Sequence, residues 1–349
     1  MSVTRRLVVP ALTLAAALAV SGARVRTDDP VSSSVRFTGE IARILDRRCL
    51  ACHDARSLSM PLTNYRDVRA WGRAIREEIV EQRMPPWSAA RGYGRFRNDL
   101  SLTAREMATV LSWIDGGMPR GDDRDLPAAP APVAAAAPDL RVPLPPQRVP
   151  ALEAQLVRRV RVTIPVDPDR PIARLVLVPG AREVLLGAQI YDAADRWVGA
   201  WLPWQREAAP PSPHAVRLGR DSRVTVELHY RGGDAEVSDE SALEVYYAPK
   251  AAPPVDEVSV DGRSRAPLSR NATLWAIVPS SDGDVRSLEL KARRPDGSTD
   301  VLLWIPQVHP EWPQAFVLDT PLALPAGTTF SLVVQPPGST ARARLGLLR

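Results

Sequence analysis

The stretch Cys49-Leu50-Ala51-Cys52-His53 contains both cysteines of the 349-residue chain. Two cysteines three positions apart, with a histidine directly after the second, form the attachment signature of c-type haem. The two thiols can form thioethers with the two vinyl groups of one porphyrin, and the adjacent imidazole is then directed at the iron as its proximal ligand. We therefore predict one covalently bound haem c, attached at Cys49 and Cys52 and ligated by His53.

Three other uses of a cysteine pair fit this sequence less well. A thioredoxin-like redox dithiol requires a βαβ context, which the surrounding sequence does not predict. A structural zinc site requires two further soft ligands nearby, and the sequence offers none. A disulfide that closes so short a loop has poor geometry. Covalent haem is therefore the hypothesis that the motif favours.

Residues 1–23 have the organisation of a signal peptide. Arg5 and Arg6 form its charged start, Leu7 to Val20 its apolar run, and Ser21-Gly22-Ala23 a small-residue cleavage site. The run is short for a membrane-spanning helix, although an uncleaved anchor is the alternative. Because bacteria attach haem c outside the cytoplasm, export agrees with the motif. We expect a periplasmic or otherwise extracytoplasmic protein with no membrane span after cleavage.

The composition gives no reason to expect a strongly charged partner. The hydrophobic fraction of 45% is ordinary for globular material, and the formal charge of +5 includes Arg5 and Arg6 of the expected signal. Lys250 and Lys291 are the only lysines among 45 basic residues, which indicates coding bias more than a nucleic-acid surface. We expect a redox partner protein and no nucleic acid.

Residues 34–126 predict a helical region around the motif. A first helix over 37–48 has an amphipathic pattern with Thr38 as a plausible N-cap, and it leads directly into the cysteines. A second helix begins after Thr63 and must end before Pro85, because proline cannot continue it.

A third helix begins at a capping box, in which Thr103 is followed three residues later by Glu106. It ends at Gly116-Gly117. Three helices with long connections around a haem are the plan of a class I cytochrome c.

Every methionine after the first residue lies in this region, so the second axial iron ligand has four candidates. Met107 lies on an apolar helix stripe, and Met118 follows a helix end near the boundary of the region. Met60 follows His53 closely, which leaves little chain for crossing to the opposite haem face. Met84 lies farther along, in a proline-stiffened loop that can hold a thioether rigidly. We favour Met84 and keep Met60 and Met118 as alternatives.

Three further motifs resemble a known family. They are Arg83-Met84-Pro85-Pro86-Trp87, the run from Tyr93 to Thr103, and Trp113-Ile114-Asp115-Gly116-Gly117. In this order they resemble exported bacterial monohaem cytochrome domains, which are often joined to copper type II, ascorbate-dependent monooxygenase-like modules. The resemblance covers most of residues 34–126, and it implies that His53 and Met84 are the axial ligands.

The composition changes sharply after residue 126. Residues 127–149 are rich in alanine and proline and predict a semi-rigid linker, so we expect the haem region to be a separate module. Beyond it, short β-branched or aromatic runs are bounded by Pro, Gly and Asp. Their spacing predicts two β-sandwiches, over 150–250 and 254–349. The expected fold is therefore multidomain, an all-α cytochrome c domain followed by an all-β part.

These two halves resemble the paired jelly-roll-like domains of peptidylglycine and dopamine monooxygenases. Glu227-Leu228-His229-Tyr230 matches a strand whose histidine binds one copper in that family. The adjacent histidine pair of the family falls at Leu185-Leu186, and its His-x-His pair falls near Ser280 and Asp282. Its distal methionine would lie beyond the present end. Since copper requires several converging ligands, we expect no bound copper.

These departures decide between the functional hypotheses. His214 and His309 lie beside prolines in expected loops and restore no three-ligand set around His229. We therefore predict an electron carrier more than an enzyme, with β-domains that dock a partner or surface and no catalytic residue. A haem-containing monooxygenase with divergent copper sites is one alternative, and a haem-anchored binding module is another.

Overall fold

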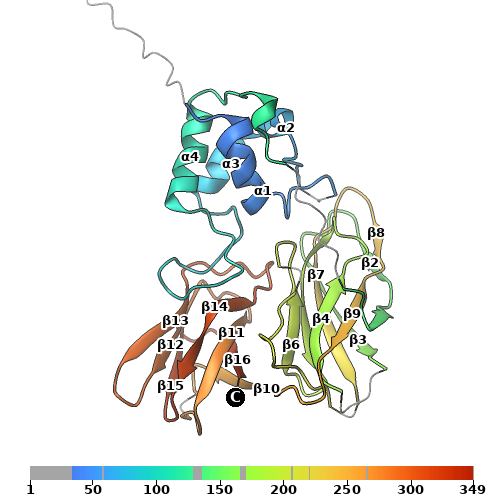
Figure 1. The fold of residues 1–349 in the computed structure, drawn as a ribbon, viewed down its shortest axis with the longest axis vertical. Coiled ribbons are helices and arrows are strands. Elements are labelled where there is room, and N and C mark those ends of the chain that lie inside the picture. Colours follow the sequence, from blue (N-terminus) through green and yellow to red (C-terminus); the bar gives the residue numbers. More distant parts are fainter. Residues whose placement is uncertain are drawn as a thin grey trace, which may run out of the picture.

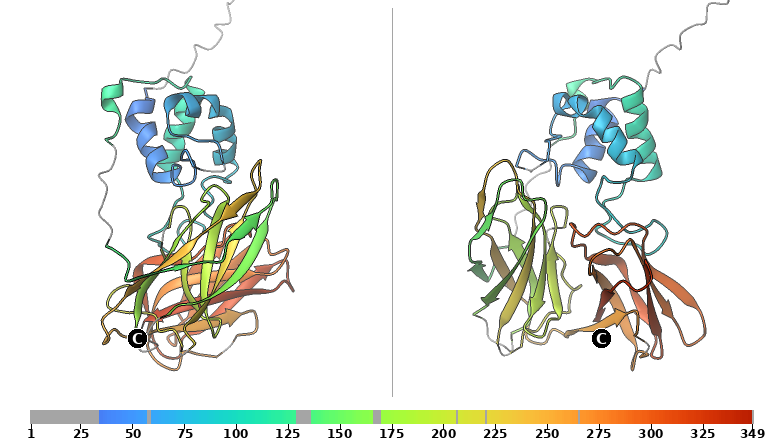
Figure 2. Two further views of the ribbon diagram at one scale, coloured as in Figure 1. Left: turned by 90° about the vertical axis from the view of Figure 1, so that its right-hand side faces the viewer. Right: turned by 180° about the vertical axis from the view of Figure 1, so that it is seen from behind.

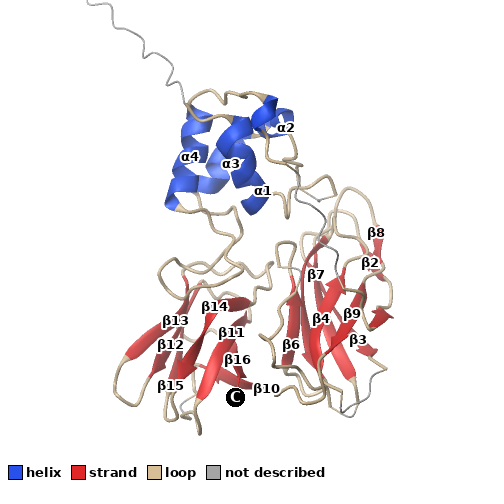
Figure 3. Ribbon diagram, viewed as in Figure 1, coloured by secondary structure: helices blue, strands red, loops and turns tan. Residues whose placement is uncertain are grey.

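The chain folds as an N-terminal helical region followed by a larger region of antiparallel sheets (Figure 1 and Figure 3). The expected order of helices and then strands is confirmed. The signal peptide expected over residues 1–23 and residues 129–135 of the expected linker lie outside the described residues. The computed structural model describes residues 34–56, 59–128, 136–165, 170–205, 207–219, 221–264 and 266–348.

The described part of the helical region contains a π-helical turn, four α-helices and a short 3-10 turn. Their bounds are Phe37–Ile41 (η1), Ala42–Arg48 (α1), Tyr65–Ala70 (α2), Gly72–Val80 (α3), Ala104–Asp115 (α4) and Asp123–Asp125 (η2). The second predicted helix begins as expected after Thr63, where the Asn64 side chain accepts a hydrogen bond from the Asp67 N–H, but it is divided at Trp71.

The predicted N-cap of the first helix is wrong. Arg36 occupies the cap position, whereas Thr38 lies inside the first turn and is buried. The N–H groups of Phe37 and Thr38 instead donate to the carbonyls of Pro119 and Arg120, both at 3.0 Å. Because a distant chain segment satisfies these groups, the helix needs no side-chain cap.

The predicted capping box of α4 is confirmed. Thr103 Oγ1 accepts from the Glu106 N–H at 3.0 Å, and Glu106 Oε2 accepts from the Thr103 N–H at 2.8 Å. Glu106 also pairs with Arg48 at the end of α1, at 3.2 Å. Burial opposes ionisation of Glu106, but the hydrogen bonds from Thr103 and Arg48 outweigh it and lower the pKa to about 2. An ionised Glu106 therefore ties the start of α4 to the turn that carries the cysteines.

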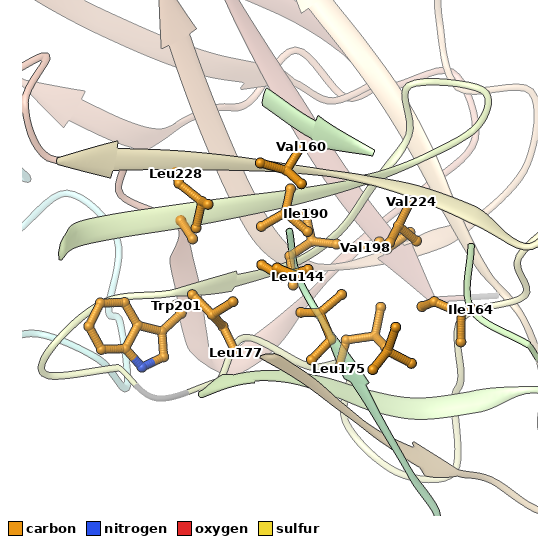
Figure 4. Close-up of a cluster of buried hydrophobic side chains, with 14 of the residues drawn as sticks. Leu144, Val160, Ile164, Leu175, Leu177, Ile190, Val198, Trp201, Val224 and Leu228 are labelled. Atoms are coloured by element: carbon orange, nitrogen blue, oxygen red, sulfur yellow. The ribbon is translucent and has the colours of Figure 1, made fainter. Parts of the chain in front are cut away.

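The first β-region consists of three antiparallel sheets with the strand orders β1-β9-β4, β3-β7-β5-β6 and β2-β8. The two larger sheets share one hydrophobic core, drawn in Figure 4. The strand bounds are Leu140–Pro143 (β1), Gln147–Val149 (β2), Leu156–Thr163 (β3), Ile172–Val178 (β4), Leu185–Asp192 (β5), Trp197–Trp201 (β6), Arg223–Tyr230 (β7), Val237–Asp239 (β8) and Ala242–Tyr247 (β9).

The range predicted for the linker, residues 127–149, extends too far, because β1 and β2 lie within it. β1 pairs with β9 and β2 pairs with β8. Both strands lie at the edge of their sheets, where prolines such as Pro143 are tolerated because an outward-facing position needs no donor. Composition alone therefore concealed two strands that belong to the first β-region.

The second β-region consists of two antiparallel sheets with the orders β10-β16-β11-β14 and β13-β12-β15, again around a shared core. The strand bounds are Val255–Asp261 (β10), Ala272–Ser281 (β11), Ser287–Arg293 (β12), Thr299–Ile305 (β13), Phe316–Leu324 (β14), Thr329–Gln335 (β15) and Ala341–Leu348 (β16).

The two β-regions pack against each other. Every residue of β5 and β6 is buried, because one face of their sheet lines the first core and the other meets the second β-region. Trp197 packs against Trp275 at a centroid distance of 5.5 Å. Arg344 pairs across the contact with Asp195 at 2.6 Å. These contacts join the two β-regions into one packed body.

The helical region is not the separate module expected from the linker. The loop between α3 and α4 descends into the second β-region (Figure 2), and its residues 85–99 are called the docking loop below. Phe96 forms an antiparallel bridge with Leu318, and the Arg97 N–H donates to the Val317 carbonyl at 2.9 Å. Trp87 contacts Phe316 in the second core, with the two ring centroids 5.1 Å apart.

Candidate functional site

The cysteine motif lies in a tight turn at the end of α1. The Cys49 N–H donates to the Leu45 carbonyl at 2.8 Å and so closes the last helical turn. The N–H groups of Cys52 and His53 then both donate to the Cys49 carbonyl at 3.0 Å. This hydrogen bonding curls the motif on itself, and the side chains of Cys49, Cys52 and His53 line the wall of one cavity.

That cavity lies inside the helical region and holds about 670 Å³ when the space open to solvent at its mouth is included. Apolar side chains from all sides dominate its wall, which suits a large flat apolar group. They include Ile44, Leu45, Ile75, Ile79, Leu102 and Val110.

His53 is oriented for coordination. The ring is buried, and its Nδ1 lies 2.9 Å from the Met60 carbonyl oxygen. A carbonyl only accepts, so Nδ1 carries the proton and Nε2 keeps a free lone pair. Burial lowers the pKa of His53, which favours the neutral ring. A backbone carbonyl that fixes the tautomer of a metal-binding histidine is the usual outer-shell arrangement.

The two thiols are unpaired in the structure. Burial raises the pKa of Cys49 and of Cys52 to about 12. Both therefore remain protonated at neutral pH, whereas a redox-active dithiol depends on a thiolate of low pKa. The environment accordingly fits thioether attachment to a buried group better than disulfide exchange.

The structure reduces the four methionine candidates to two. Met60 and Met84 line the cavity. Met107 and Met118 pack into the helical core instead, where the Met118 sulfur lies over Gly72 so closely that a β-carbon there would clash. The Met60 carbonyl accepts a hydrogen bond from the His53 ring. Met84 lies in a different segment of the chain, after α3.

The first β-region closes one side of the motif. A second cavity of about 510 Å³, called the junction cavity below, is lined by Cys52, His53 and Met84 together with Arg182 and Trp312. The Arg182 guanidinium donates to the Ala51 carbonyl at 2.6 Å and pairs with Asp54 at 3.2 Å. Sequence reasoning missed these β-region residues, because no local pattern signals a contact between such distant positions.

A third cavity, of about 720 Å³, lies between the two β-regions and contains the histidine singled out from the sequence. His229 Nε2 lies 3.0 Å from Glu227 Oε1, but the buried Nδ1 has no hydrogen-bond partner among the described residues. His309 and Ser280 line the same cavity, whereas Leu185 and Leu186 line the junction cavity. Of the two ring nitrogens of His229, only Nε2 is therefore paired within the described residues.

The described residues contain no group of three or more histidine, cysteine and acidic side chains placed to hold a metal ion. None of the helices in the described ranges is both long and apolar enough to cross a membrane.

Comparison with known proteins leaves the function open. No protein-family model matches the chain, and neither does any curated protein. Among solved structures, the chain is similar to the crystal structure of the major capsid protein P2 from bacteriophage PM2. The sequence identity is 9%, the alignment covers 60% of this chain and 96% of that chain, and the TM-score is 0.22. A superposition this weak carries no argument.

Proposed function

We propose that this protein is an exported c-type cytochrome that carries single electrons to or from a partner protein. The observation that carries the proposal is that Cys49, Cys52, His53 and Met84 all line one apolar cavity. Haem c attached there supplies one-electron transfer. In finer terms, the proposal assigns the helical region to the class I cytochrome c plan and the β-regions to two jelly-roll-like sandwiches.

Four side chains of the cavity wall would hold the haem. Cys49 and Cys52 would provide the covalent attachment, and His53 would provide a ring nitrogen to the iron, in an orientation that the Met60 carbonyl maintains. Met84 would provide a thioether as the other protein ligand. The apolar wall excludes water, which raises the reduction potential by disfavouring the more highly charged ferric state.

The β-regions serve as docking modules in this proposal. They already hold the motif loop through Arg182 and the docking loop through the second core. The redox partner is an extracytoplasmic protein, since the expected signal directs the chain out of the cytoplasm. We assign no catalytic residue and propose no bound copper.

The proposal is tested on the full-length protein after export. Under denaturing conditions, the intact mass should exceed that of the processed polypeptide by one haem, because thioether bonds survive unfolding. A redox titration should follow a single one-electron transition. A mass without the added haem would contradict the proposal.

A second candidate function is ligand binding by the β-regions, and the cavity between them favours it. His229 is buried there with Nδ1 unpartnered, and an unpaired buried acceptor or donor costs about 1–3 kcal/mol. A small ligand with a complementary hydrogen-bonding group would remove this cost. The protein would then be a haem-anchored binding module.

His229→Ala tests this candidate and the copper-enzyme alternative together. We expect unchanged haem content and electron-transfer rate, with at most about 1 kcal/mol lost in stability, because Glu227 keeps Arg159 as a partner at 2.8 Å. Native mass spectrometry should find any cavity ligand on the unaltered protein and not on the variant. Tightly bound stoichiometric copper, or ascorbate-driven hydroxylation abolished by the substitution, would instead establish the copper enzyme.

A further inference from the structure

We infer that the second β-region positions the Met84 thioether through Gln314, which makes Gln314 a positioning residue for the second axial ligand. This inference rests on the proposed function. It gives the second β-region a role in setting the haem environment, in addition to docking.

Gln314 is 4% exposed and directs both ends of its amide at the docking loop. Its Nε2 donates to the Pro86 carbonyl at 2.5 Å. Its Oε1 accepts from the Ser88 hydroxyl at 3.0 Å and from the Ser88 N–H at 3.4 Å. A buried side chain from a distant region therefore clamps the backbone two residues after Met84.

The far end of the docking loop is clamped by the same stretch of the second β-region. Asn98 Nδ2 donates to the Ala315 carbonyl at 2.7 Å, and Asn98 Oδ1 accepts from the Val317 N–H at 3.1 Å. Both ends of the loop are thus tied to residues 314–317. The loop cannot shift relative to residues 314–317 without breaking these hydrogen bonds, of which the one from Gln314 to Pro86 is buried.

Met84 lies between this clamp and the helical region. Its N–H donates to the Glu78 carbonyl in α3 at 3.2 Å. The two residues that follow are prolines with fixed φ angles, so a displacement at Pro86 is transmitted to Met84 rather than absorbed. Trp312, two residues before Gln314, lines the junction cavity together with Met84.

The position of the loop has a direct chemical consequence. A thioether is a weak, neutral ligand whose bond to iron depends on the sulfur being held in place. Outer-shell partners that orient a metal ligand typically contribute 10–100-fold to metal affinity. Loosening the clamp should therefore weaken methionine ligation without removing the methionine.

The test is an imidazole titration of the full-length ferric holoprotein, following loss of the sulfur-to-iron charge-transfer band. In Gln314→Ala, the imidazole concentration for half displacement should fall about 10-fold, and the reduction potential should fall. Ser88→Ala removes one of the three hydrogen bonds and should produce a smaller shift in the same direction. Gln147→Ala is the control for loss of a glutamine side chain, because Gln147 donates to the carbonyls of Pro145 and Pro146 and not to the docking loop.

The outcomes separate the inference from the proposed function. Without covalent haem or a sulfur band in the unaltered protein, the proposed function or its Met84 ligand fails, and the inference fails with it. With the band present, a half-displacement concentration in Gln314→Ala equal to that of Gln147→Ala overturns the inference alone. If Gln314→Ala does not accumulate, the imidazole titration of Ser88→Ala is the test. A half-displacement concentration in Ser88→Ala equal to that of the unaltered protein overturns the inference.

Discussion

The double variant Cys49→Ala/Cys52→Ala is expected to carry no covalent haem, a change from one haem per chain to none. Thioether attachment requires the two thiols, and the sequence contains no other cysteine. Without the haem, the apolar side chains that line the cavity lose the group against which they would pack. We therefore expect reduced helical content and an unfolding midpoint well below that of the unaltered protein.

Intact mass under denaturing conditions measures the attachment, and far-ultraviolet circular dichroism measures the helices. Leu50→Ala is a matched control, because Leu50 lies between the two cysteines but supplies no thiol or iron ligand. This control should keep its haem. Equal haem content in the double variant and the control would show that the cysteines do not attach it.

Met84→Ala is expected to produce the largest change in redox behaviour. Removing the thioether leaves the sixth iron position without its protein ligand, so the low-spin spectrum and the sulfur-to-iron band should disappear. The potential should fall by on the order of 0.1 V or more, within the roughly 0.8 V range that axial ligands set. Haem content should not change, because the attachment residues lie on a different segment of the cavity wall.

Met60→Ala is the decisive control for this prediction. Met60 also lines the cavity, and its carbonyl still accepts from His53 when the side chain is shortened. The spectrum of Met60→Ala should therefore resemble that of the unaltered protein. A band retained in Met84→Ala and lost in Met60→Ala would exchange the roles of the two methionines.

Local patterns predicted the helical elements because their causes are local. The capping box of Thr103 and Glu106 lies within one helical turn, so the residues that form it are near neighbours in the chain. The same reasoning failed at Thr38, where the carbonyls of Pro119 and Arg120 satisfy the helix start. A distant partner of this kind leaves no trace in the surrounding sequence.

Burial of a charged strand residue also depends on distant partners. β16 contains Arg344, with which Asp195 and Glu257 pair at 2.6 and 3.1 Å. β1 and β2 were concealed by the proline-rich composition around them, although only β1 contains a proline, Pro143, at the edge of its sheet. In each strand, contacts with distant residues stabilise a conformation that the local sequence disfavours.

The sequence by itself determined the candidate site and the order of the fold. The spacing of Cys49, Cys52 and His53 is a property of adjacent residues, and the change from helical to strand periodicity is visible along the chain. Only the tertiary structure decided that Met107 and Met118 lie away from the cavity, and that the docking loop belongs to the core of the second β-region. The physical reason is that Gln314 and Pro86, more than two hundred positions apart, meet through packing, and a one-dimensional pattern holds no record of such a contact.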